Sequence, residues 1–192
     1  MSNSRKGIAG KRIYLRPFTG DDIDWYYEAL LQQESNRLTG TKKLFSREVL
    51  RNYLDTIASD RERAQFVIAL QEDDRPIGEI AIMDMDPSNR SGHIRIAIFA
   101  EEDCGQGYGS EAMILMLDYG FGMLNLNRIE LVVFSYNARA VRAYEKIGFV
   151  QEGIQREALY YNHEYHDSIM MSILAREFRG RHGVSAGASS SV

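Results

Sequence analysis

Alternating apolar and polar positions predict most of the strands of this 192-residue chain. Apolar residues recur with a period of two in short segments that are bounded by turn residues. We expect strands at 12–18, 65–70, 77–83, 93–99, 128–134, 149–157 and 165–174. A turn at 72–75 joins two of them as a hairpin, and Asn162-His163 separates the last two. The sheet is therefore expected to be largely antiparallel.

Apolar residues at helical spacing predict four helices. The first follows a capping box at Thr19-Gly20-Asp21-Asp22, and the second begins at Ser46 and runs to about position 59. The third spans 110–124, and the fourth spans 138–147, capped by Asn137 and ended by Gly148. The polar stretch 35–44 is expected to be a loop.

These elements indicate one domain of mixed α/β (α+β) class over residues 1–179. Residues 180–192 are small and polar, so we expect a disordered tail there. The basic start of the chain lacks the apolar region of a signal peptide, and no apolar run is long enough to span a bilayer.

Composition narrows the classes of function. The net charge of −4 argues against a general nucleic-acid binder, which needs a clustered positive surface. The single cysteine, Cys104, excludes an internal disulfide and a cysteine-based metal site, and it favours a reducing compartment. We therefore expect a cytoplasmic protein without a metal, a nucleic-acid partner or a membrane contact.

A glycine-rich segment, Cys104-Gly105-Gln106-Gly107-Tyr108-Gly109-Ser110, lies between a predicted strand and a predicted helix. Glycines let the backbone turn tightly, and the N–H groups at a helix start have no intrahelical partner. The segment is therefore suited to a pyrophosphate. A Walker loop needs a lysine after its last glycine, and a dinucleotide fingerprint needs its third glycine one residue later, so neither pattern is met. A glycine-rich turn without a ligand is the alternative.

A second segment, 135–149, reads as a capped amphipathic helix with Tyr144 on its apolar face. Asn137 can cap this helix and still offer its side-chain amide outward. Taken alone, the segment is equally consistent with a structural helix in which Tyr144 fills the core.

Together the two segments resemble the signatures of the GNAT superfamily of N-acetyltransferases. The first resembles its Gln/Arg-x-x-Gly-x-Gly/Ala loop except that Cys104 occupies the first position. The second matches Asn-x-x-Ala/Ser-x-x-x-Tyr-x-Lys-x-Gly-Phe at Asn137, Ala140, Tyr144, Lys146, Gly148 and Phe149. The resemblance runs from about Lys11 to Phe178. It implies a GNAT-like sheet with helices on both faces and two splayed strands around a coenzyme A site.

The resemblance also implies roles for individual residues with acetyl-coenzyme A (acetyl-CoA) as cosubstrate. Tyr144 would donate a proton to the leaving thiolate, and the Asn137 amide would bind the pantetheine arm. The backbone of Ile98 and Phe99 would pair with this arm like an added strand. The pyrophosphate would lie on the backbone amides of Gln106, Gly107, Tyr108, Gly109 and Ser110. Transfer to a primary amine would be direct, which leaves no covalent role for Cys104.

The general base is less clear. Many relatives place a glutamate in the strand 93–99, whereas this chain has no carboxylate there. Glu79, Glu130 and His93 are the candidates, and a water chain without a single base is an alternative.

The acceptor amine also stays open. Within the superfamily, the chain resembles the branch of the spermidine/spermine and ribosomal-protein N-terminal acetyltransferases. The features are Arg16-Pro17-Phe18, Leu126-Asn127-Arg128, and the run from Tyr160-Tyr161-Asn162 to Tyr165-His166-Asp167. A polyamine, a peptide N-terminus and another small amine are all compatible, with Glu28, Glu34, Asp84 and Asp86 as possible polyamine ligands.

Two other classes of function are alternatives: a non-catalytic acyl-CoA-binding or sensing module of the same fold, and a nucleotide-dependent enzyme. A homodimer is expected only because it is common in enzymes of this type.

Overall fold

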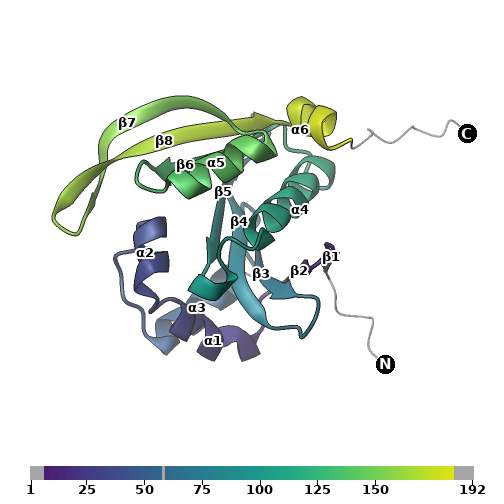
Figure 1. The fold of residues 1–192 in the computed structure, drawn as a ribbon. Coiled ribbons are helices and arrows are strands. Elements are labelled where there is room, and N and C mark those ends of the chain that lie inside the picture. Colours follow the sequence, from purple (N-terminus) through teal and green to yellow (C-terminus); the bar gives the residue numbers. More distant parts are fainter. Residues whose placement is uncertain (1–6, 58, 184–192) are drawn as a thin grey trace, which may run out of the picture.

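An eight-stranded, twisted sheet organises the described part of the chain, which comprises residues 7–57 and 59–183 of this computed structural model (Figure 1). The strand order is β1-β2-β3-β4-β5-β6-β8-β7. Every neighbouring pair is antiparallel except β5 and β6, which are parallel. The expected mixed, largely antiparallel sheet is therefore confirmed. Its strands are β1 (Ile8–Ala9), β2 (Ile13–Arg16), β3 (Ala64–Leu70), β4 (Pro76–Asp86), β5 (Ser91–Ile98), β6 (Arg128–Phe134), β7 (Val150–Tyr161) and β8 (Glu164–Leu174).

Helices cover both faces of the sheet, as expected. They are α1 (Ile23–Ala29), α2 (Gln33–Thr39), α3 (Arg47–Ile57), α4 (Tyr108–Gly122), α5 (Ala138–Ile147) and α6 (Ala175–His182). Alternate residues of a strand point to opposite faces, and β5 shows this directly. Ile94 belongs to the larger cluster with α4 and α6, whereas Ala97 and Phe99 belong to a smaller cluster with α1 and α3.

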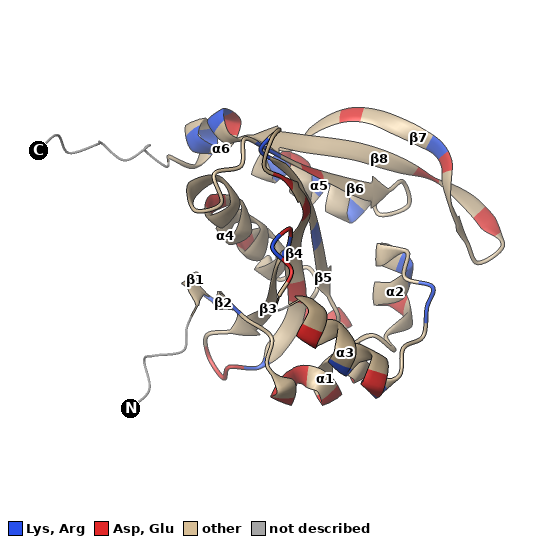
Figure 2. Cartoon of the chain, turned by 180° about the vertical axis from the view of Figure 1, so that it is seen from behind, with Lys and Arg blue, Asp and Glu red and all other residues tan. Residues whose placement is uncertain are grey.

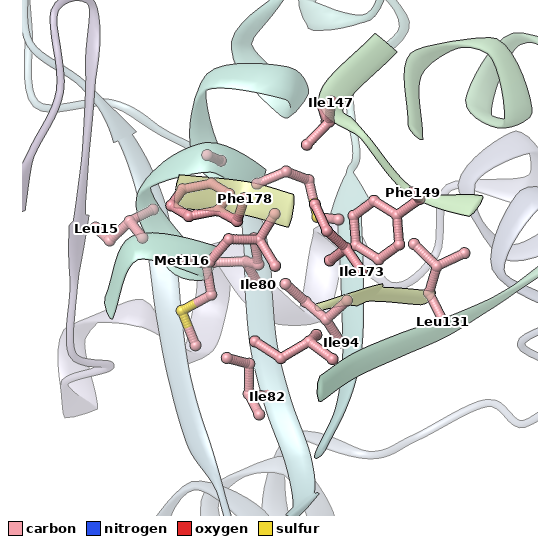
Figure 3. Packing of buried hydrophobic residues seen from close by; sticks show 14 of the residues in the cluster. Leu15, Ile80, Ile82, Ile94, Met116, Leu131, Ile147, Phe149, Ile173 and Phe178 are labelled. Atoms are coloured by element: carbon pink, nitrogen blue, oxygen red, sulfur yellow. The ribbon is translucent and has the colours of Figure 1, made fainter. Parts of the chain in front are cut away.

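The larger cluster fixes α4 against the sheet. Figure 3 shows Ile80, Ile82 and Ile94 from the strands together with Met116 of α4 and Phe178 of α6. Gly120 lets α4 approach closely, because a Cβ there would lie 2.8 Å from a methyl carbon of both Ile82 and Ile129. This close contact fixes the C-terminal part of α4 against β4 and β6.

Two expectations about local structure are wrong. The stretch 35–44 is not entirely a loop, because α2 covers its first residues up to Thr39. Gly40 ends this helix in the left-handed conformation with φ of 67°, and the Glu34–Arg37 ion pair spans one turn. The seven-residue helix is too short to show an apolar period, which explains the error.

The C-terminal boundary also lies later than expected. Residues 180–182 continue α6, whose Phe178 is buried against Phe121 with ring centroids 5.5 Å apart. Nε2 of His182 lies 2.9 Å from the carbonyl oxygen of Ile147 and forms a hydrogen bond with it. One buried ring and this bond hold a segment whose composition is otherwise polar. The rest of the expected tail, 184–192, lies outside the described residues.

Candidate active site

A cavity of about 730 Å³ lies where β5 and β6 separate. The two strands pair only at Ser91–Arg128, Gly92–Ile129 and His93–Glu130. Beyond these pairs, β5 continues to pair with β4 and β6 with β8, so the facing edges of β5 and β6 have no strand partner. The backbone groups on these edges can bond an extended ligand that lies between the strands.

The glycine loop forms one end of the cavity. Gly105 and Gly107 have left-handed φ values of 76° and 86°, which side-chain-bearing residues adopt only with strain. The first helical bond of α4 runs from the N–H of Glu111 to the carbonyl of Gly107 at 3.1 Å. The N–H groups of residues 108–110 therefore have no intrahelical partner. Gly105, Gly107, Gly109 and Ser110 line the cavity, and an anion fits this arrangement.

A brace from the turn between β1 and β2 holds this loop from behind. Nη1 of Arg12 donates to the carbonyl of Gln106 at 2.8 Å, and its Nε donates to Glu111 at 3.2 Å. The guanidinium lies 4.8 Å from the ring centroid of Tyr108. Glu111 also accepts the backbone N–H groups of Lys11 and Arg12 at 2.6 and 2.8 Å. Burial opposes the ionised form of Glu111, but these hydrogen bonds outweigh it and lower the pKa of the carboxyl.

Tyr144 and Asn137 of the second segment both line the cavity. The Tyr144 ring lies 5.9 Å from that of Phe149, and burial raises the pKa of its hydroxyl to about 12. The hydroxyl makes no hydrogen bond with the described residues and stays protonated at neutral pH. Oδ1 of Asn137 accepts the N–H of Ala140 at 3.2 Å as the helix cap, which leaves its amide nitrogen available to a ligand.

The two predicted carboxylate bases do not line the cavity. Glu79 is 7% exposed and accepts hydrogen bonds from Tyr26 at 2.9 Å and from Gln65 at 2.7 Å. Burial raises the pKa of its carboxyl, and the attraction of Arg95 opposes the rise. Glu130 is bound to Arg128 at 2.9 Å on the exposed side of β6.

His93 and Asp84 do line the cavity. Burial lowers the pKa of the His93 imidazole, and Arg95 works in the same direction, whereas Glu130 and Asp84 oppose the shift. The ring is therefore neutral at pH 7, with one nitrogen able to accept a proton. Asp84 lies beside the register shift between Met83 and Asp86, a β-bulge of the kind that re-aims side chains.

Only some of the remaining residues that were predicted to bind the cofactor line the cavity. Ile98 lines the cavity, but Phe99 is buried beneath α1, and its N–H already donates to the carbonyl of Ile77 at 3.1 Å. Neither Gln106 nor Tyr108 is part of the lining: the Gln106 carbonyl and the Tyr108 ring contact Arg12, while the Tyr108 N–H stays without an intrahelical partner. Sequence reasoning also missed cations in the lining, which are Arg95, Arg139, Arg142 and Lys146. Of these, only Lys146 was part of a recognised motif.

The fold and this cavity define a transferase that handles an acyl-CoA. Residues 12–150 match the family model described as acetyltransferase (GNAT) domain, so the chain belongs to the GNAT acetyltransferase family. Spermidine N(1)-acetyltransferase of Escherichia coli (strain K12) is 25% identical over 170 residues, covering 88% of this chain and 90% of that protein. The SPbeta prophage-derived uncharacterized N-acetyltransferase YokL of Bacillus subtilis is 29% identical over 133 residues, covering 69% and 75%.

Solved structures agree with the sequence relatives. The crystal structure of spermidine N-acetyltransferase from Vibrio cholerae in complex with CoA and spermine superimposes with a TM-score of 0.83 at 27% identity. The match covers 88% of this chain and 99% of that one. Within the described residues, no helix is long and apolar enough to cross a membrane, and no three His, Cys, Asp or Glu side chains gather as a metal site.

We predict that Arg12→Ala weakens the binding of acetyl-CoA about fivefold, because the glycine loop loses its brace while its own residues stay unchanged. The Arg12 side chain is half exposed, so the loss corresponds to about 1 kcal/mol. Calorimetric titration with acetyl-CoA measures the effect. Lys11→Ala is the matched control, since it removes a neighbouring charge whose side chain bonds none of the described residues. Equal affinity in the two variants would contradict the brace.

Proposed function

We propose that this N-acetyltransferase binds acetyl-CoA between β5 and β6 and transfers the acetyl group directly to a primary amine that enters from the α2 side. The observation that carries the proposal is the cavity itself, which joins the glycine loop at one end to His93 and Asp84 at the other. Tyr144 of α5 also lines this cavity.

The residues present fit acetyl-CoA. The unpartnered N–H groups of residues 108–110 and the positive end of α4 favour the pyrophosphate. The cations of Arg142 and Lys146 add to this field from α5. Ile96 and Ile98 offer an apolar wall and the free edge of β5 to the pantetheine arm, and the Asn137 amide can donate to it.

His93 is proposed as the general base, in preference to Glu79 and Glu130. An ammonium with a pKa of about 10.4 is almost fully protonated at pH 7, so the enzyme must remove a proton before the nitrogen can attack. The neutral His93 ring lines the cavity, whereas the carboxylate of Glu79 is enclosed by Tyr26 and Gln65. The proton can reach the imidazole directly or through one water.

Tyr144 is proposed as the acid for the leaving thiolate. Bond formation between the amine nitrogen and the acetyl carbon breaks the bond to sulfur, and the thiolate needs a proton. The Tyr144 hydroxyl has no competing partner among the described residues and a pKa of about 12, so it holds this proton at neutral pH. An N–H on the free edge of β5 can steady the carbonyl oxygen during the attack.

The amino-acid composition supports a proposal about the compartment and the partners of the enzyme. We place the enzyme in the cytoplasm, without a resident metal and with no nucleic-acid or membrane partner, because its single cysteine and mildly acidic charge favour that setting. Relatives that are named spermidine N-acetyltransferases make a polyamine, beside peptides and other amines, a candidate acceptor.

We predict that Tyr144→Phe lowers kcat by about 10²-fold and leaves the KM for acetyl-CoA nearly unchanged, because the phenol acts on the leaving group. Thiol release from acetyl-CoA with a panel of amines measures both constants. Tyr108→Phe is the control, since its ring lies under Arg12 outside the cavity lining. If the protein binds acetyl-CoA but no amine causes thiol release, the chain is a non-catalytic binding module. If it does not bind acetyl-CoA, the proposal is wrong.

We predict that kcat/KM for the amine rises with pH through an imidazole pKa below 6.5, because the base works only when neutral and burial lowers its pKa. His93→Gln should lower the plateau about 10²-fold and abolish this acidic limb. Glu130→Gln serves as the comparison and should retain the limb. If both variants keep the wild-type profile, His93 is not the base.

We also propose a homodimer through β7. This strand ends the sheet, and its Val150 and Ile154 are 57% and 54% exposed. Apolar side chains along an unpaired strand edge favour pairing with a second copy. Light scattering after size exclusion should give twice the monomer mass, and Ile154→Glu should give the monomer. Met123→Glu alters an exposed apolar residue directly after α4 and should stay dimeric. A monomeric wild type would contradict the proposal.

A further inference from the structure

The α2 side of the cavity has a charge pattern that a polycation does not fit. This acceptor side is lined by Ser35, Leu38 and Thr39 of α2 and by Asp84, His93 and Arg95 of the sheet. The last two alternate along β5 with Ile94 and Ile96, which pack toward α4. The acceptor side therefore lies on the opposite face of the sheet from α4, beside α2.

Most carboxylates near the acceptor side are already bound to arginines. Glu34 pairs with Arg37 at 2.7 Å, and Glu28 pairs with Arg47 at 3.1 Å. Glu130 pairs with Arg128. Asp86 accepts hydrogen bonds from the turn at Ser88 and Asn89 instead of facing the cavity. Of the four acids first considered as polyamine ligands, only Asp84 lines the cavity, where it forms no ion pair with an arginine or lysine of the described residues but attracts the His93 ring.

The cations at the acceptor side form no direct ion pair with the described residues, although Glu79 attracts Arg95 and Glu34 attracts Arg139 over a longer distance. Arg95 is exposed and donates only to the hydroxyl of Thr41 at 3.3 Å, and Arg139 lines the cavity without an ion pair to the described residues. Lys42 and Lys43 follow α2, again without a carboxylate partner in the described chain. Figure 2 shows basic positions on the loop after α2, whereas α2 and α3 each carry both basic and acidic positions.

A second groove of about 470 Å³ shares no lining residue with the first cavity, but Thr41 links the two. It lies between the loop after α2 and the tip of the β7–β8 hairpin, and its lining includes Lys42, Lys43, Tyr160, Tyr161 and His163. Thr41 joins the two spaces. Its hydroxyl contacts Arg95 of the first cavity and lies 2.9 Å from the hydroxyl of Thr39, while Thr41 itself lines the second groove.

We propose that the acceptor is the N-terminal amine of an acidic peptide, whose carboxylates lie on Arg95, Lys42 and Lys43 while its amine reaches His93. The inference rests on the proposed acetyl transfer and names its substrate class. An extended backbone would reach from the first cavity past Thr41 into the second groove. The tyrosines and His163 supply further donors for peptide and carboxylate oxygens. Arg95 acts as the specificity-determining residue, because it lies where the two spaces meet.

Spermidine fits this surface poorly, although it is the substrate named for several relatives. A polyamine brings additional ammonium groups that need carboxylates, and Asp84 alone is free to meet them on this side. Like charges that face each other across an interface lower affinity, whereas complementary charges raise affinity and speed association.

The experiment compares acceptors at saturating acetyl-CoA, so that the charge of the cosubstrate does not affect the comparison. The panel holds peptides of one serine followed by three aspartates, three asparagines or three arginines, together with free aspartate and spermidine. We expect kcat/KM to be about tenfold higher for the aspartate peptide than for the asparagine peptide, and lowest for the arginine peptide and spermidine. Added salt should reduce the advantage of the aspartate peptide, because it screens the attraction.

Variants test which residues cause the preference for the aspartate peptide. Arg95→Gln, and separately the double change Lys42→Gln with Lys43→Gln, should each reduce the preference for aspartate over asparagine about three- to tenfold. The readout is the ratio of kcat/KM for the two peptides, so an effect of Arg95→Gln on His93 that is common to both peptides cancels. Arg176→Gln is the matched control, because it removes an exposed arginine on α6 and should keep the full preference. The lysine pair tests the inference even if Arg95→Gln destabilises the fold.

The outcomes separate this inference from the proposed function. Preferred acetylation of spermidine or the arginine peptide would retain the enzyme and overturn the acidic acceptor. Equal use of free aspartate and the aspartate peptide would overturn the role of the second groove. An unchanged preference in both variants would overturn the named residues. Binding of acetyl-CoA without acetylation of any member of the panel would count against the catalytic proposal and, with it, the inference.

Discussion

The separation of β5 from β6 after three residue pairs is the constraint on which the site depends. Buried backbone groups in proteins are almost always paired, so a gap inside a sheet needs a partner from water or from a ligand. Each strand is held by its other neighbour, β4 or β8, so the gap does not close when the facing edges stay free. A rigid, polar-edged slot results. Its shape is set by the ladders on either side and not by the ligand.

The helices then place chemistry around this slot. The close approach at Gly120 fixes α4, and the brace from Arg12 fixes the loop that precedes it. The α5 helix begins at the Asn137 cap directly after β6, so Tyr144 lies two turns further along the same wall. The glycine loop and Tyr144 are thus attached to elements that pack elsewhere in the core, which keeps the two in a defined relation.

The sequence predicted the elements whose signal is local. Strand alternation, the glycine loop and the Asn137 cap are all read within a few residues, and each appears in the structure close to its expected place. The Arg12–Glu111 brace joins positions 99 apart, so no local pattern carries it. The short helix α2 and the end of α6 were not predicted for a related reason, because neither shows an apolar period. A glycine cap ends α2, and one buried ring holds α6.

The comparison of the candidate bases shows why residue type alone does not predict which side chain faces the cavity. Glu79 and His93 lie on adjacent strands of the same sheet, but the Glu79 side chain is buried beneath α1, where Tyr26 and Gln65 both donate to its Oε2. Its remaining influence is electrostatic, because the attraction between Glu79 and Arg95 opposes the effect of burial on the carboxyl pKa. A buried carboxylate in this position attracts a nearby arginine without neutralising it by a direct ion pair. Glu79 therefore favours the cation of Arg95 beside the slot, and of the three candidate bases only the half-buried His93 lines it.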